Sequence, residues 1–177
     1  MPGELAWEHA VRDIPESGLA VERTASPVER DGIARALELV ACRSLTARYR
    51  VAPKGGGHLH VSGTVEGEVE QTCVVTLEPL LNKVADSFSV DYWPEGTDMP
   101  EPRGGAVDAH DEPDLEPIVA GRIEIGRVIF ECLAGAIDLF PRKPGAAFEP
   151  STTAPEGGGS DGRDSPFAAL AKIKNKR

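Results

Sequence analysis

A long alternation of apolar and polar residues, interrupted by glycines, constrains the fold of this chain most strongly. The alternation starts at Leu45, breaks at the glycines of "PKGGG", and resumes at Leu59. A period of two places successive side chains on opposite faces of a β-strand, and glycine permits the positive φ of a tight connection. The sequence therefore predicts a β-hairpin over Leu45–Val65.

The same alternation continues as far as Leu77, which is too long for one ordinary strand. Gly63 and Gly67 are therefore expected to mark a bulge or a sharp bend. Glu78-Pro79 is expected to end the ladder of hydrogen bonds, because proline has no N–H group to donate.

Two segments have a helical period instead. Pro27–Cys42 follows Ser26 and contains Glu29, which together form a capping box with proline at the first helical position. Its apolar residues recur at i, i+3, i+4, i+7 and i+8, as they do over Glu124–Ile137. Pro141 prevents continuation of the second helix.

These patterns predict an α+β domain over residues 1–148. Its bent antiparallel sheet runs from Leu45 to Trp93, ends in a strand over Val84–Trp93, and packs against the two amphipathic helices. The segment Leu5–Val11 is expected to add an edge strand. The expected core residues are Leu37, Val40, Tyr49, Val61, Val65, Val69, Cys73, Phe88, Val128, Ile129, Cys132 and Leu133.

Three segments lack the pattern of a packed element. Residues 95–117 hold eight acidic residues, four prolines and one arginine, which predicts a mobile acidic loop within the domain. Residues 149–164 are rich in Gly, Pro, Ser and Thr and are predicted to be a disordered linker. Residues 165–177 form a basic C-terminal arm with apolar residues at helical spacing, which favours an arm that folds on a partner over a solvated tail.

The charge balance bears on the partner. The chain has 29 acidic and 19 basic residues, a formal charge of −10. Because phosphate binding requires lysine and arginine, this balance favours a basic protein partner over nucleic acid. The acidic segment provides the candidate dock, comprising Asp108, Asp111, Glu112, Asp114 and Glu116.

Cys73 stands three residues before Thr76, where a second cysteine would complete C-x-x-C. A structural zinc site needs four ligands, usually in close pairs, so a buried thiol is the favoured interpretation. The H-x-H pair His58 and His60 lacks completing ligands and is interpreted as a solvated strand face. "KGGGH" is followed by a strand and not by a helix, which favours a hairpin turn over a phosphate-binding loop.

No catalytic motif is recognised, and no metal, cofactor or small-molecule substrate is expected. The three cysteines, which form no close pair, favour a reducing cytoplasm. The sequence shows no signal peptide and no apolar run that would span a bilayer, so no membrane partner is expected.

The segment Pro141–Gly145, "PRKPG", has two interpretations. Arg142 and Lys143 interact favourably with the preceding helix C-terminus, or they form a preorganised basic knuckle for phosphate or an acidic partner. The first is slightly favoured. Further candidate RNA-binding or partner-binding cations lie in the C-terminal arm, namely Lys172, Lys174, Lys176 and Arg177.

The order of three motifs resembles the YceD family, the large ribosomal RNA subunit accumulation proteins. They are "VSGTVEGEVEQTCVVTLEPL", then "EPIVAGRIEIGRVIFECLAGAIDLFPRKPGAAF" after the acidic segment, and finally "SPFAALAKIK". Many members of the family have C-x-x-C where this chain has Cys73 and Thr76, so a metal role is not carried over.

The resemblance implies a non-enzymatic cytoplasmic factor that supports accumulation of large-subunit (23S) ribosomal RNA. With its negative charge, the chain is expected to bind a basic ribosomal protein or an assembly intermediate of the large subunit. The alternative is direct RNA binding through Pro141–Gly145 and the basic C-terminal arm.

Overall fold

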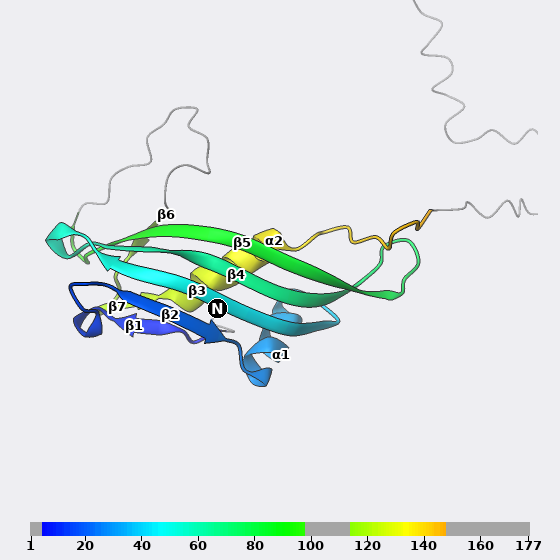
Figure 1. The fold of residues 1–177 in the computed structure, drawn as a ribbon, viewed down its shortest axis with the longest axis horizontal. Helices are drawn as coiled ribbons and strands as arrows, with labels where there is room; N and C mark the ends of the chain where they lie inside the picture. The colour runs from blue at the N-terminus through cyan, green and yellow to red at the C-terminus, as the bar shows by residue number, and fades with distance from the viewer. Residues whose placement is uncertain (1–4, 98–113, 148–177) are drawn as a thin grey trace, which may run out of the picture. The chain divides into compact units, whose positions relative to one another are not determined.

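Two β-sheets and two α-helices occur in the part of the chain that the computed structural model describes, residues 5–97 and 114–147 (Figure 1). The larger sheet comprises β2 (Leu19–Thr24), β3 (Ala41–Pro53), β4 (Leu59–Thr72), β5 (Pro79–Trp93) and β6 (Asp114–Pro117). The smaller comprises β1 (Glu8–Ala10) and β7 (Arg122–Glu124), and the helices are α1 (Pro27–Ala36) and α2 (Ile125–Ala136). Short 3-10 helices occupy Val11–Asp13 and Gly55–Gly57. The predicted α+β class is confirmed.

The larger sheet has the strand order β2-β3-β4-β5-β6. Neighbouring strands in this sheet are antiparallel, except for β5 and β6, which are parallel. Alternate residues of β3, such as Leu45 and Val51, have no exposed surface and form the inner face. Helix α2, which lies behind β4 and β5 in Figure 1, contributes the buried residues Ile129 and Leu133 to the same core.

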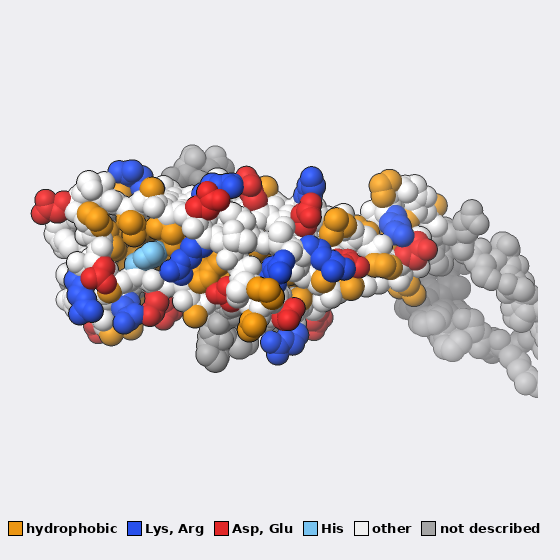
Figure 2. Space-filling model, turned by 60° about the horizontal axis from the view of Figure 1, so that its bottom comes forward, with side chains coloured by type: hydrophobic (Ala, Val, Ile, Leu, Met, Phe, Trp, Pro, Cys, Tyr) orange, Lys and Arg blue, Asp and Glu red, His pale blue; other side chains and the backbone are white. Residues whose placement is uncertain are grey.

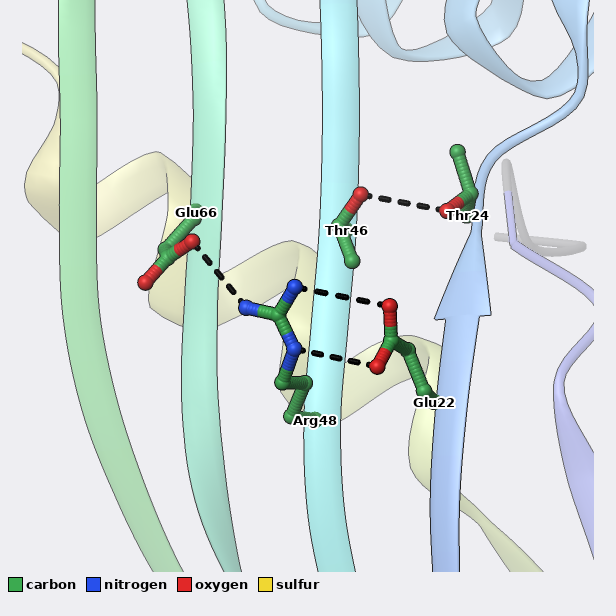
Figure 3. A network of polar contacts seen from close by, with 5 residues as sticks. All are labelled: Glu22, Thr24, Thr46, Arg48 and Glu66. Atoms are coloured by element: carbon green, nitrogen blue, oxygen red, sulfur yellow. Dashed lines mark hydrogen bonds and ion pairs between the residues drawn. The ribbon is translucent and has the colours of Figure 1, made fainter.

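The opposite face of the sheet carries cross-strand pairs of charges. The Arg48 Nε donates to Glu22 at 3.1 Å and its Nη1 to Glu66 at 3.2 Å, beside a contact between Thr24 and Thr46 (Figure 3). Further pairs join Arg43 to Glu70 and Lys83 to Glu68. Exposed pairs of this kind add little stability, but they balance the charge of this face locally.

The predicted hairpin is confirmed, although its strands are longer than expected. A bulge or a sharp bend was predicted at Gly63 and Gly67. Strand β4 pairs with β5 without interruption over 14 residues, so the first alternative, the bulge, is wrong. The register shift lies on β3, between Cys42 and Ser44. Gly63 is required for packing instead, because a Cβ there would lie 2.3 Å from the Arg48 oxygen.

The predicted end of the ladder at Pro79 is also wrong. Pro79 is the first residue of β5 and lies opposite Thr72 of β4. Proline is tolerated at the first position of a strand, where its missing N–H group breaks no further pairing. The strand predicted over Val84–Trp93 therefore begins five residues earlier.

Helix α1 begins as predicted but ends at Ala36, six residues before the expected end. The Ser26 Oγ accepts from the Glu29 amide at 3.3 Å, and the Glu29 carboxylate accepts from the Ser26 amide at 2.8 Å. Glu38 then adopts a positive φ of 53°, and the Val40 amide donates to Glu70 of β4. Pairing with β4 thus replaces the end of the predicted helix. The prediction of Val40 as a core residue is wrong, since its side chain is exposed.

Most other core predictions are confirmed. Leu37, Phe88 and Cys132 are only partly buried, and they pack against the core. The remaining buried residues of the predicted set are Tyr49, Val61, Val65, Val69, Cys73, Val128, Ile129 and Leu133.

Strand β1 lies in the predicted N-terminal segment but pairs with β7 in the smaller sheet, not at the edge of the larger one. Residues 114–117, predicted as part of the acidic loop, form β6. Residues 98–113, the predicted linker and the C-terminal arm lie outside the described residues. Within the described part, no helix is long and apolar enough to cross a membrane.

Candidate interaction site at the end of the sheet

Two segments distant in the sequence meet at one end of the larger sheet. They are residues 73–78, between β4 and β5, and residues 138–145, after α2; together we call them the tip. The Val74 amide donates to the Pro141 oxygen at 2.9 Å. The Gln71 side-chain amide donates to the Asp138 oxygen at 2.8 Å. The tip is therefore one hydrogen-bonded unit.

Cys73 joins the two segments. Its Sγ accepts from the Thr76 amide at 3.4 Å and from the Lys143 amide at 3.4 Å. The side chain has no exposed surface, which confirms the predicted buried thiol. However, Cys73 lies beyond the end of β4 and outside the main hydrophobic cluster. Among the described residues, no group of three or more His, Cys, Asp or Glu residues could hold a metal ion.

The donors around Cys73 change its acidity. Hydrogen bonds from the Thr76 hydroxyl, and then from the Thr76 and Lys143 amides, lower the pKa of the Cys73 thiol from 9.0 to about 6. These donors stabilise the thiolate more than the neutral thiol. The contact between Cys73 and Lys143 is thus strongest when Cys73 is ionised.

We expect this thiolate to make the stability of the protein depend on pH. Between pH 6 and pH 9 the unfolded chain retains the Cys73 proton and the folded chain does not, so the free energy of unfolding rises with pH. In Cys73→Ser this rise should be smaller. Urea unfolding from pH 6 to pH 9 measures the difference.

Cys132→Ser is the matched control for that experiment. Burial raises the pKa of the Cys132 thiol to about 11, so Cys132 does not ionise in this range. Between pH 6 and pH 8 the unfolded chain also keeps the Cys132 proton, so in that range its replacement should leave the pH dependence unchanged. If the wild-type protein and Cys73→Ser showed the same pH dependence of unfolding, the lowered pKa of the Cys73 thiol would be contradicted.

Large apolar side chains are exposed on both segments of the tip. Leu77 is 76% exposed, Leu139 is 78% exposed and Phe140 is 70% exposed, and Val74 beside them is exposed too. Figure 2 shows hydrophobic side chains interspersed with charged ones at the right-hand end of the molecule. Leu77 has a positive φ of 58°, which is unfavourable for a bulky side chain.

The two predicted cations of the tip differ in their contacts. The Lys143 Nζ donates to the Glu78 carboxylate at 2.7 Å, and this hydrogen bond lowers the pKa of Glu78. Arg142 is exposed and forms no ion pair with any residue in the described ranges. Lys143 therefore joins the two segments of the tip, whereas Arg142 has no such role among the described residues.

The described candidates for the acidic dock lie at the opposite end of β5. Asp114 and Glu116 belong to β6, which pairs with the last residues of β5. Asp114 lies opposite Val90, 11 residues after Pro79 at the tip end of β5, so at about 3.3 Å per residue it lies about 36 Å from the tip along the strand. Asp114 is exposed, whereas Glu116 pairs with Arg127, which also pairs with Glu131 at 3.0 Å.

Glu116 therefore holds β6 against α2. Outside the described residues lie the other candidates, Asp108, Asp111, Glu112, Lys172, Lys174, Lys176 and Arg177. The predicted acidic and basic sites are thus not parts of one site in the described structure.

The two histidines of the H-x-H pair do not converge. The His60 Nδ1 lies 2.6 Å from the Asp91 carboxylate, which also accepts from Lys54 at 3.0 Å. The ring of His58 packs edge-on against Trp93 instead, with centroids 4.2 Å apart. Both side chains are half-buried in these contacts, so the face that was predicted to be solvated is only partly exposed.

The exposed apolar residues of the tip were not predicted. In the alternating pattern Leu77 falls on an apolar position that would face the core, but in the structure it lies in the loop and is exposed. Leu139 and Phe140 provide a sequence signal, because they are large apolar residues placed after the helical period has ended and before Pro141. The pattern alone does not bring them to the loop after β4.

Comparison with known protein families matches residues 61–174, more than half of the chain, to the family described as "Large ribosomal RNA subunit accumulation protein YceD". No curated protein and no solved structure matches the chain. The matched region includes β5, α2 and both segments of the tip. This extent agrees with the motif order seen in the sequence, and the chain belongs to the YceD family.

Proposed function

We propose that the protein is a non-enzymatic factor that supports accumulation of large-subunit (23S) ribosomal RNA by binding a ribosomal protein or an assembly intermediate. The family match over residues 61–174 is the observation that supports this function most directly. The family description refers to the ribosomal RNA of the large subunit, and the proposed mode of action is binding without a chemical step.

The charge of the chain supports a basic ribosomal protein as the partner. A formal charge of −10 attracts basic proteins and repels RNA. The proposed dock comprises Asp114 at the start of β6 and the acidic residues that precede it in the sequence, Asp108, Asp111 and Glu112. Glu116 contributes less because its carboxylate already binds Arg127.

Direct RNA binding is the second candidate. Arg142 is exposed two residues after Phe140, whose ring is also exposed. Single-stranded RNA sites combine cations with aromatic rings on which bases stack. The four cations of the C-terminal arm, Lys172, Lys174, Lys176 and Arg177, would add further phosphate contacts on an acidic protein.

Depletion and complementation in cells test the function. Loss of the protein should lower the ratio of 23S to 16S ribosomal RNA on a gel, and wild-type protein should restore it. An unchanged ratio after depletion would refute the proposal. One complementing variant carries Asn or Gln at Asp108, Asp111, Glu112 and Asp114, and another carries Gln at Lys172, Lys174, Lys176 and Arg177.

The two variants distinguish the modes of binding. Failure of the acid-neutralised variant to restore the ratio supports a basic protein partner. Failure of the cation-neutralised variant, together with RNA binding in a filter assay that weakens steeply with salt, supports RNA contact. Both variants should retain the wild-type melting temperature, because neither changes a buried residue among those described.

A further inference from the structure

We propose that the tip is a docking surface for a polypeptide segment of a partner protein, one that presents apolar side chains and a carboxylate opposite Arg142. This surface lies about 36 Å along β5 from Asp114, the described residue of the proposed acidic dock. The inference goes beyond the proposed function, because it rests on the geometry of the tip and not on the ribosomal role.

The exposure of large apolar side chains on two joined segments is the first argument. Single exposed leucines are common on protein surfaces, but a cluster of them marks an interaction site. Leu77 and Val74 lie on one segment of the tip, and Leu139 and Phe140 lie on the other. The hydrogen bond from Val74 to Pro141 brings the two segments into contact.

The backbone of Leu77 is the second argument. A positive φ of 58° is favourable for glycine and unfavourable for leucine. The side chain is 76% exposed, so packing within the chain does not compensate for this conformation. Neither the local backbone nor the core therefore explains a leucine here. A binding surface does, because residues in unfavourable conformations cluster at functional sites.

The third argument is that the tip is held in place before any ligand binds. The Asp138 carboxylate accepts from the Phe140 amide at 2.9 Å, and its backbone oxygen accepts from Gln71. The Cys73 thiol and the Glu78 carboxylate hold Lys143. A surface that is already ordered loses little conformational entropy on binding.

The charges and side-chain types indicate the class of partner. Lys143 is paired with Glu78, whereas Arg142 is exposed and pairs with no carboxylate in residues 5–97 and 114–147, so Arg142 is the cation that we expect to bind a carboxylate. The exposed side chains are three aliphatic ones and one aromatic ring. Aliphatic and aromatic anchors beside an arginine are typical of protein interfaces, whereas RNA sites depend on several stacking rings.

The test uses a phage-displayed library of random 16-residue peptides as the probe and the full-length protein as the target. Selection should enrich sequences that combine two or more large apolar residues with Asp or Glu. Synthetic peptides of the enriched sequence are then titrated against the protein and its variants by fluorescence anisotropy.

Leu77→Gly and Phe140→Asn should each weaken the binding of these peptides about tenfold, as expected for central anchors. Leu77→Gly should do so with an equal or higher melting temperature, because glycine accepts the positive φ. Arg142→Glu should reverse the preference from acidic to basic peptides. Val119→Asn is the matched control, since Val119 is exposed between β6 and β7 and should not affect binding.

Four results would overturn the proposal. The first two are a selection that enriches no sequence, and enriched peptides that bind Leu77→Gly as tightly as the wild-type protein. The third is that a twelve-nucleotide oligouridylate binds the wild-type protein and that Phe140→Asn and Arg142→Glu each abolish this binding. The fourth is that the wild-type protein self-associates in sedimentation experiments and that Leu77→Gly abolishes the self-association. The last two would assign the tip to RNA or to a second copy of the chain. An unchanged ribosomal RNA ratio on depletion would refute the proposed function alone, so the two failures are distinguishable.

Discussion

Replacement of Gly126 by alanine is expected to lower the free energy of unfolding by about 3 kcal/mol, near the upper end for overpacking of a core. A Cβ at this position would lie 2.0 Å from the Leu5 oxygen and 3.0 Å from the Trp7 amide nitrogen. Both atoms belong to the backbone, so no side chain can move aside to make room. The Gly126 amide also donates to the Trp7 oxygen at 2.8 Å, which fixes the N-terminal segment against α2.

Gly135→Ala is the matched control in the same helix. Apart from the adjacent residues and the backbone of the helix itself, no atom lies within 4 Å of a Cβ at Gly135, and alanine is about 0.5–1 kcal/mol more favourable than glycine inside a helix. This variant should therefore gain stability while Gly126→Ala loses it. Urea unfolding followed by circular dichroism measures both, and a loss of similar size in the two variants would contradict the packing argument.

Leu133→Ala is expected to lower the free energy of unfolding by about 2–5 kcal/mol, because it removes buried methyl groups and leaves a cavity. Leu133 is 1% exposed and packs in the core beneath β4 and β5. Leu139→Ala, six residues further along the chain, removes the same atoms from an exposed position. Its effect should lie within about 0.5 kcal/mol of zero.

The same unfolding measurement compares the two leucines, and peptide binding provides a second measurement. Leu139→Ala should weaken binding at the tip although it leaves stability unchanged. Equal stability losses in both variants would show that Leu139 packs in the fold. In that case the tip would have to be reassigned as a structural element.

These comparisons separate residues that stabilise the fold from residues that the fold only presents. Packing explains both Gly126 and Leu133. Gly126 lies against the backbone of the N-terminal segment, and Leu133 lies in the core. Packing does not explain Leu77 and Phe140, because both are exposed and one has an unfavourable backbone conformation. Variants of the tip should therefore change binding without unfolding the protein.

The sequence by itself determined the features that depend on neighbouring residues. The capping box of Ser26 and Glu29 placed the start of α1, and both of its hydrogen bonds are present. The period of two predicted the hairpin of β3 and β4. The apolar spacing predicted α2 to within one residue at each end. All of these signals act within a few positions along the chain.

Only the tertiary structure decided where strands end and which segments meet. The end of α1 depends on the pairing of Val40 with Glu70, and the place of β1 depends on β7, more than a hundred residues away in the chain. The tip exists because the Cys73 thiol accepts from the Lys143 amide, 70 positions further along. Hydrogen bonds between distant segments leave no period in the sequence, so the surface they create becomes visible only in the folded chain.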